Sequence, residues 1–148
     1  MLVEGGRKTV ETYHCNFSRF EGPFWGAWYF DSNATYASFE DAYTDNAGVN
    51  GVISFGGSKI TLNGSHFSGN RADEGTVHFH KSSYLQTEGR KSWASVNYDD
   101  PLLAIFDRCI FEENVGEMGA ALFIDMDPSD FLANNPSASI GGEIYLTR

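Results

Sequence analysis

The sequence predicts an all-β fold, a right-handed parallel β-helix, and two observations lead to this prediction. First, one phrase recurs: an aromatic residue, Asn three positions later, Gly at +8 and Phe at +12. Full copies begin at Tyr43, Phe67 and Phe111, and a looser copy covers residues 17–30. Second, the short stretches between turn residues show no helical stripe of apolar side chains, which favours strands. A period of 24 residues, from 43 to 67, suits one rung of a solenoid.

Each copy supplies two predicted strands whose side chains alternate between the inside and the outside. In the strand after the Gly, the inward set is expected to be Trp28, Phe30, Ile53, Phe55, Val77, Phe79, Ala121 and Phe123. Their alternates, expected to face outward, are Ala27, Tyr29, Val52, Ser54, Thr76, His78, Ala120 and Leu122. In the strand before the aromatic, the inward set is Val10, Thr12, Ile60, Leu62, Ala104 and Phe106, and the register of residues 36–39 stays open. Four small residues precede the turn aromatic: Cys15, Ala42, Ser65 and Cys109.

Stacked rungs place like residues on like residues at about 4.8 Å. The repeated aromatics therefore predict a column of rings. Asn46, Asn70 and Asn114 predict a ladder in which each side-chain amide bonds the next. The Gly at +8 predicts a sharp backbone turn that a side chain would block.

The domain organisation follows from the spacing of the copies. The third full copy begins 44 residues after the second, one period plus an inserted loop at 81–100. Residues 1–148 then form a single β-helix segment of four to five coils. Because solenoids need polar caps on their ends, we expect this segment to belong to a longer solenoid or to be covered by partner chains or further coils at open ends.

The phrases Phe67-Ser-Gly-Asn70 and Phe111-Glu-Glu-Asn114, each followed by a strand of Gly and small apolar residues, carry a resemblance. They resemble the FxxN and GGAI repeats of polymorphic outer-membrane proteins and related adhesin-type β-helices of the pectin-lyase-like fold. Gly141-Gly-Glu-Ile144 is a further near match. The likeness covers roughly residues 43–124, although Tyr43 replaces Phe and the full copies lack the double Gly. It implies the fold, and the same scaffold carries adhesins, polysaccharide lyases and structural fibres.

Charge and cysteine usage exclude some partners. The net charge of −10 repels nucleic acid and anionic membrane surfaces. No run is long and apolar enough to insert into a membrane, and no signal peptide is visible, so any export signal is expected outside this chain. Cys15 and Cys109 occupy equivalent places three rungs apart, about 14 Å, which is too far for a disulfide. We expect both thiols to be free and buried.

The inserted loop is the predicted ligand-binding region, because solenoids place function on their long excursions. It concentrates basic and aromatic residues that suit sugar rings or acidic glycans, beside two histidines. The candidate residues are His78, His80, Lys81, Tyr84, Arg90, Lys91 and Trp93. The alternative is a solvated loop or a packing contact between subunits, with His78 an ordinary surface residue.

Two further motifs each have a functional and a plain interpretation. Asp125, Asp127 and Asp130 offer oxygen ligands for Ca²⁺, but the segment lacks the central Gly and final Glu of a calcium loop, and a polar turn is the alternative. Sequons at Asn16, Asn33 and Asn63 predict glycosylation of a surface glycoprotein, or are coincidental.

The sequence therefore predicts an extracellular or cell-surface structural or adhesive segment, with glycan or protein contacts through the 81–100 loop. A polysaccharide lyase or glycoside hydrolase is one alternative, because stacked coils bring together remote carboxylates such as Asp41, Asp107 and Glu112. The sequence shows no phosphate loop, nucleophile elbow or zinc spacing, and no catalytic residue is assigned. A subunit of a fibre or large assembly that stacks end to end is the other alternative.

Overall fold

A computed structural model describes residues 2–3, 8–30, 34–56, 59–80, 85–87, 90–92, 102–125 and 142–147. Every regular element in these residues is a β-strand. The strands are β1 (Leu2–Val3), β2 (Lys8–Tyr13), β3 (Asn16–Ser18), β4 (Glu21–Gly22), β5 (Trp28–Phe30), β6 (Ala34–Phe39), β7 (Ala42–Thr44), β8 (Ala47–Gly48), β9 (Ile53–Phe55), β10 (Lys59–Asn63), β11 (His66–Ser68), β12 (Val77–His80), β13 (Leu85–Thr87), β14 (Arg90–Ser92), β15 (Leu102–Asp107), β16 (Ile110–Glu112), β17 (Leu122–Asp125) and β18 (Gly142–Thr147).

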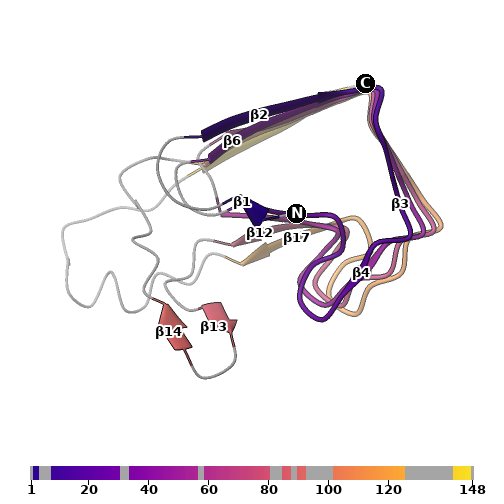
Figure 1. Cartoon of the computed structure of the whole chain (residues 1–148). Helices are drawn as coiled ribbons and strands as arrows, with labels where there is room; N and C mark the ends of the chain where they lie inside the picture. Colours follow the sequence, from indigo (N-terminus) through magenta and orange to yellow (C-terminus); the bar gives the residue numbers. More distant parts are fainter. Residues whose placement is uncertain are drawn as a thin grey trace.

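Three larger parallel sheets are stacked from successive copies of the repeat (Figure 1), and β4 pairs with β8 in a fourth, two-stranded parallel sheet. Sheet A has the order β1-β5-β9-β12-β17, sheet B the order β18-β15-β10-β6-β2, and sheet C the order β16-β11-β7-β3. We number as copies 1 to 4 the strand sets β2-β3-β5, β6-β7-β9, β10-β11-β12 and β15-β16-β17, each with one strand in each sheet. This all-β arrangement of parallel sheets is compatible with a parallel β-helix-like solenoid. The described parts of the inserted loop, β13 and β14, pair antiparallel.

Sheet C and the turn after it carry the aromatic column and the asparagine ladder, which confirms both predictions. Along the column, ring centroids are 5.0 Å apart from Phe17 to Tyr43, 4.4 Å from Tyr43 to Phe67 and 4.6 Å from Phe67 to Phe111. Asn46 Nδ2 donates to Asn70 Oδ1 at 3.0 Å. Asn70 Nδ2 donates in turn to the Oδ1 of the next copy at 2.9 Å. Each Nδ2 also donates to the carbonyl oxygen of the aromatic residue one copy earlier.

Two corners flank each strand of sheet C, and both use the left-handed backbone region. The first corner has φ between 51° and 63° in all four copies, at His14, Glu40, Gly64 and Arg108. The second corner has φ between 53° and 63°, at Arg19, Asp45, Gly69 and Glu113. Only one copy places Gly at these positions, so the sequence did not reveal the corners. A third turn does follow the predicted Gly: a Cβ on Gly75, at φ 87°, would lie 2.9 Å from the carbonyl oxygen of Gly119.

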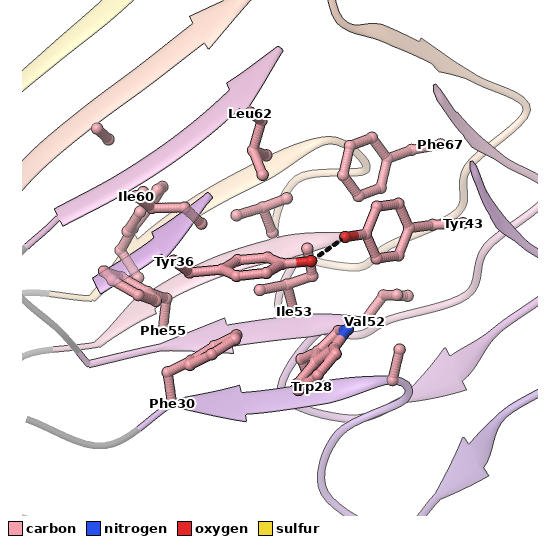
Figure 2. Packing of buried hydrophobic residues seen from close by; sticks show 14 of the residues in the cluster. Trp28, Phe30, Tyr36, Tyr43, Val52, Ile53, Phe55, Ile60, Leu62 and Phe67 are labelled. Carbon is pink, nitrogen blue, oxygen red and sulfur yellow. Dashed lines mark hydrogen bonds between the residues drawn. The ribbon is translucent and has the colours of Figure 1, made fainter. Parts of the chain in front are cut away.

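The hydrophobic core lies between the three sheets (Figure 2). Polar side chains that the sequence did not place in the core, Ser38 and Asp41 among them, are buried as well. The register of β6, which the sequence left open, aligns Tyr36 with Ile60 and Ser38 with Leu62. The Tyr36 and Tyr43 hydroxyls share a short hydrogen bond inside the core. Burial raises the pKa of Tyr36 to about 12 and that of Tyr43 well above its usual value.

The prediction that a small residue precedes the turn aromatic in every copy is wrong for copy 2, where Ala42 was placed in line with Ser65. Ala42 pairs with Asn16 and His66, so the residue in line with Ser65 is Asp41, whose side chain is 1% exposed. Its carboxylate accepts hydrogen bonds from the Cys15 backbone N–H at 2.7 Å and from Ser38 Oγ at 2.7 Å. Copy 2 therefore holds a buried carboxylate where the sequence predicted a methyl group. Cys15 and Cys109 are free, as predicted, but each is only half-buried, so the prediction that both are buried is wrong.

The predicted outward set after the Gly is mostly buried. Ala27 and Val52 belong to the hydrophobic core, because they stand at a bend where strict alternation does not hold. There the N–H groups of Val52 and Ile53 both donate to the carbonyl oxygen of Thr76, at 2.9 and 3.0 Å. Within the strands, Ile53, Phe55, Val77 and Phe79 are buried in the core as predicted, but burial does not alternate, because Ser54 and His78 between them are buried as well.

Copy 4 departs from the predicted register in sheet A. Val77 pairs with Leu122 and Phe79 with Ile124, so Phe123 pairs with His78 on the outer face. One more residue separates Asn114 from the strand than in copy 3, and a shift of one residue moves every side chain to the opposite face. The predicted inward position of Phe123 and the predicted outward position of Leu122, which packs against the core, are therefore both wrong. In the part of the chain that is described, no helix could cross a membrane.

Candidate functional site

The structure describes only part of the predicted ligand-binding set. Lys81, Tyr84 and Trp93 lie outside the described residues, while Arg90 and Lys91 belong to β14, where the backbone alone is described. His78 and His80 in β12 are 4% and 5% exposed. The prediction that His78 is an outward surface residue is therefore wrong as regards its exposure.

A cluster of aromatic rings buries both histidines on the outer face of sheet A. The His80 imidazole stacks on Tyr29 with centroids 5.4 Å apart, and Tyr29 stacks on Trp25 at 4.5 Å. His80 reaches across copy 2 because Gly56 has no side chain there: a Cβ at Gly56 would lie 2.6 Å from His80 Cε1. Small residues in one copy thus make room for a large ring from the next.

The rings of this cluster pack against one another, and the buried imidazole of His80 carries no charge. Burial, and then the charge of His78, lowers the pKa of His80 to about 3, so its imidazole is neutral at physiological pH. His78 Nδ1 lies 3.1 Å from the carbonyl oxygen of Asn50 and 3.4 Å from Glu74 Oε2. Within the described residues no group of three His, Cys, Asp or Glu side chains is arranged to hold a metal ion.

The remaining predicted sites fall in different places. Asp125 is in β17 without a described side chain, and Asp127, Asp130 and Asn33 lie outside the described residues. Asn16 is exposed in β3. Asn63 is partly exposed, and its amide Nδ2 donates to Asp107 Oδ2 at 3.1 Å.

The carboxylates considered for an enzyme do not share a face. Asp41 points into the core, Asp107 ends β15 on the outer side of sheet B, and Glu112 lies on sheet C, where it pairs with His66 at 2.8 Å. The structure therefore brings none of these three together as an acid–base pair.

A partly exposed row at the end of sheet B brings together residues that the sequence did not group with one another. The parallel register aligns the last residues of β2, β6, β10 and β15 on the outer face, and we call these residues the corner row: Tyr13, Phe39, Asn63 and Asp107. The rings of Tyr13 and Phe39 stack at 4.8 Å with an interplanar angle of 9°. Tyr13 is 54% exposed, and its hydroxyl donates to Glu11 Oε2 at 2.8 Å.

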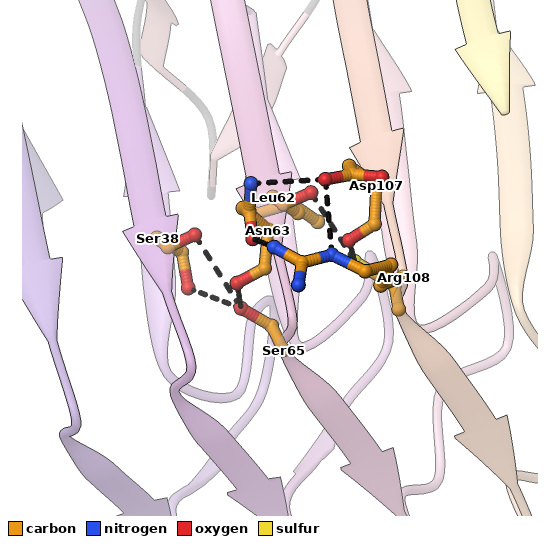
Figure 3. Close-up of polar contacts among 7 residues, drawn as sticks. Ser38, Leu62, Asn63, Ser65, Asp107 and Arg108 are labelled. Carbon is orange, nitrogen blue, oxygen red and sulfur yellow. Dashed lines mark hydrogen bonds and ion pairs between the residues drawn. The ribbon is translucent and has the colours of Figure 1, made fainter. Parts of the chain in front are cut away.

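The polar half of the corner row is tied together by the neighbouring Arg108 (Figure 3). Arg108 Nη2 donates to Asn63 Oδ1 at 2.7 Å, and its Nε donates to Asp107 Oδ2 at 3.2 Å. The left-handed corner at Arg108, φ 51°, turns this side chain back over the strand ends. As a result, three planar polar groups, an amide, a carboxylate and a guanidinium, are hydrogen-bonded to one another beside two stacked rings.

The sequence did carry one signal for this row. Tyr13, Phe39, Asn63 and Asp107 each stand one residue after an inward position of the strand before the turn, at the same offset in every copy. Because the register of residues 36–39 was left open, the sequence analysis did not align these four residues.

Compared with protein-family models, curated proteins and solved structures, the chain gives no significant match to any of the three.

Proposed function

We propose that the chain is a segment of a right-handed parallel β-helix, with four to five coils, that serves as a structural or adhesive element at an extracellular or cell surface. A chain that returns to the same sheet in parallel makes a crossover that is nearly always right-handed. The repeated residues support a structural role, because each of them takes part in ring stacking, in the amide ladder or in a turn. The mechanism is display of a surface, without catalysis.

The observation that carries a binding role is the corner row. It exposes a stacked aromatic pair beside a preorganised cluster of hydrogen-bonding groups, Asn63, Asp107 and Arg108. A sugar ring has a hydrocarbon face that packs on aromatic rings and hydroxyl groups that bond planar polar side chains. The predicted loop 81–100 remains a second proposed contact.

Charge selects the kind of glycan. Glu11, Glu40 and Asp107 place three carboxylates around the row, against the one guanidinium of Arg108 and a His14 that pairs with Glu40 at 3.3 Å. The whole chain carries a net charge of −10. Neutral glycans are therefore favoured over acidic ones, which the local field would repel.

Binding to an array of neutral and acidic glycans tests this proposal. We expect Tyr13→Ala to remove binding of the neutral ligand, because the exposed ring is lost, and Arg108→Gln to weaken it. Tyr29→Phe is the matched control, since it changes a tyrosine that is 3% exposed on another sheet. Full binding by Tyr13→Ala would exclude the corner row, and loss of binding after deletion of 81–100 would assign the ligand to the loop.

A further inference from the structure

The dipeptide Asn-Gly occurs twice in the sequence, as Asn50-Gly51 in the turn before β9 and as Asn63-Gly64 at the first corner after β10. An Asn that precedes Gly can lose its side-chain amide spontaneously, because the Gly nitrogen, which no neighbouring side chain shields, attacks the Asn Cγ. The fold places these two identical dipeptides in different surroundings.

At Asn63, hydrogen bonds hold both groups that would react. The attacking nitrogen, that of Gly64, donates to the carbonyl oxygen of Asp107 at 2.8 Å. The Asn63 amide donates through Nδ2 to Asp107 Oδ2 at 3.1 Å, and its Oδ1 accepts from Arg108 at 2.7 Å. Because these bonds must break before the nitrogen can turn towards Cγ, the reaction at Asn63 requires local opening of copy 4.

At Asn50, the fold acts on the peptide group through its oxygen instead of its nitrogen. His78 Nδ1 lies 3.1 Å from the Asn50 carbonyl oxygen and 3.4 Å from Glu74 Oε2. A carbonyl oxygen can only accept a hydrogen bond, so Nδ1 carries the proton and donates it. This carbonyl belongs to the same peptide group as the Gly51 nitrogen. A donor on the oxygen draws electron density from that nitrogen and makes its N–H a stronger acid.

The surroundings of Asn50 favour the same reaction. His78 is buried, and a hydrogen bond polarises its acceptor more strongly there than in water. Asn50 is partly exposed in its turn, so water can reach the side chain and ammonia can leave. Gly51 has φ 102°, and a Cβ there would lie 3.0 Å from the carbonyl oxygen of Gly75. The position after Asn50 therefore requires Gly.

We propose that Asn50 is a site of spontaneous deamidation that His78 promotes, whereas the same dipeptide at Asn63 is protected by its hydrogen bonds. Hydroxide takes the proton of the Gly51 nitrogen, and the nitrogen attacks Asn50 Cγ to close a cyclic imide. The bond between Cγ and the amide nitrogen breaks, and ammonia leaves with a proton from water, which restores the hydroxide. A second water then opens the imide to aspartate or isoaspartate.

The product changes copy 2 in two ways. It adds a negative charge to a turn that already holds Glu74, in a chain of net charge −10. Isoaspartate also lengthens the main chain of the turn before β9. In copy 4 the corresponding turn is longer, and its strand pairs with a shifted register. We therefore expect the pairing of β9 to weaken as the molecule ages. This inference does not rest on the proposed adhesive role.

Mass spectrometry of the whole chain aged at neutral pH tests the inference. Proteolytic peptides report the conversion of amide to acid at each Asn, and an isoaspartate-specific methyltransferase labels the isomerised product. We expect conversion at Asn50 to be at least about tenfold faster than at Asn63, which needs local opening. In concentrated urea the two rates should become similar, because only the fold distinguishes the dipeptides. Equal rates in the folded chain, or a faster rate at Asn63, would overturn the inference.

Variants of His78 test its part in the reaction. His78→Phe keeps a ring in the aromatic cluster but removes the donor, and we expect conversion at Asn50 to slow about fivefold, the effect of one hydrogen bond. His78→Gln keeps a side-chain N–H and should retain most of the rate. His66→Phe, at a partly exposed histidine of sheet C, is the matched control and should leave Asn50 unchanged. Unchanged conversion in folded His78→Phe would contradict promotion by His78.

The rate at Asn63 shows in every variant whether the fold is kept. If His78→Phe unfolds the chain, Asn63 converts faster as well, and the ratio of the two rates in the unmodified chain then decides. Arg108→Gln releases Asn63 Oδ1, and we expect it to raise conversion at Asn63 about fivefold. No rise would contradict protection by Arg108. None of these measurements uses glycan binding, so the proposed function and this inference fail independently.

Discussion

Copy 3 and copy 4 carry the same phrase but occupy different surroundings. In copy 3, Phe67, Val77 and Phe79 are fully buried between strands of the neighbouring copies. In copy 4, Phe111 and Leu122 are only partly buried, and the register of sheet A has moved by one residue. The phrase therefore specifies local geometry, while burial depends on whether a further layer covers it.

The aromatic column gives the largest expected contrast. Phe67→Ala leaves a cavity between two stacked rings, and we expect it to cost about 3–5 kcal/mol of unfolding free energy. Phe111→Ala removes a ring that is only partly buried and that stacks, among the described residues, on Phe67 alone, and we expect roughly half that cost. Urea unfolding of the two variants checks this, with Phe67→Leu as a milder control; equal costs would mean that the copy 4 end is covered in solution.

The asparagine ladder gives the next contrast. The Asn70 side chain takes part in four hydrogen bonds, two as acceptor and two as donor. Among the described residues, Asn114 takes part in three. We expect Asn70→Ala to cost about 3 kcal/mol and Asn114→Ala about 1 kcal/mol less, because buried partners lose their bonds. Thermal and urea unfolding measure both, and a larger loss at Asn114 would contradict the open ladder.

The pH dependence of stability tests the burial of His80. Its folded-state pKa of about 3 lies below the unfolded value of 6.5, so the unfolded chain binds the extra proton between these values. Stability is full above about pH 6.5 and falls as the pH drops. We expect a loss of about 2 kcal/mol from pH 7 to pH 5. His80→Gln should remove this part of the slope, whereas His14→Gln, which changes an exposed residue, should leave it unchanged.

Surface pairs give the smallest expected effect. The ion pair of His66 and Glu112 joins copies 3 and 4 across sheet C, with both side chains about half exposed. We expect Glu112→Gln to cost under about 1 kcal/mol, and Glu40→Gln, at the more exposed His14 pair, no more than that. Unfolding at low and high salt measures both; a larger loss at Glu112 would show that this pair holds copy 4 in place.

Much of the candidate site was beyond the sequence. Of its two histidines, His78 was predicted to face outward by strand alternation, which says which face a side chain takes but not what packs over that face. The corner row was missed because the register of residues 36–39 was left open, although Phe39 stands four residues before its turn aromatic, as Tyr13 does in copy 1. Ligand binding by the 81–100 loop stays a prediction, because the side chains of this loop are not among those that the structure describes.

The sequence by itself determined the aromatic column, the asparagine ladder and the glycine turns. Like residues stacked at one spacing reward identity, and that identity is visible as a repeat. Tertiary structure alone decided that Asp41 stands in the core, that Phe123 faces outward and that His80 lies over Gly56. These outcomes depend on single-residue differences in the turns and on the space that a neighbouring copy leaves, because in stacked strands one residue of register changes the face of every side chain that follows.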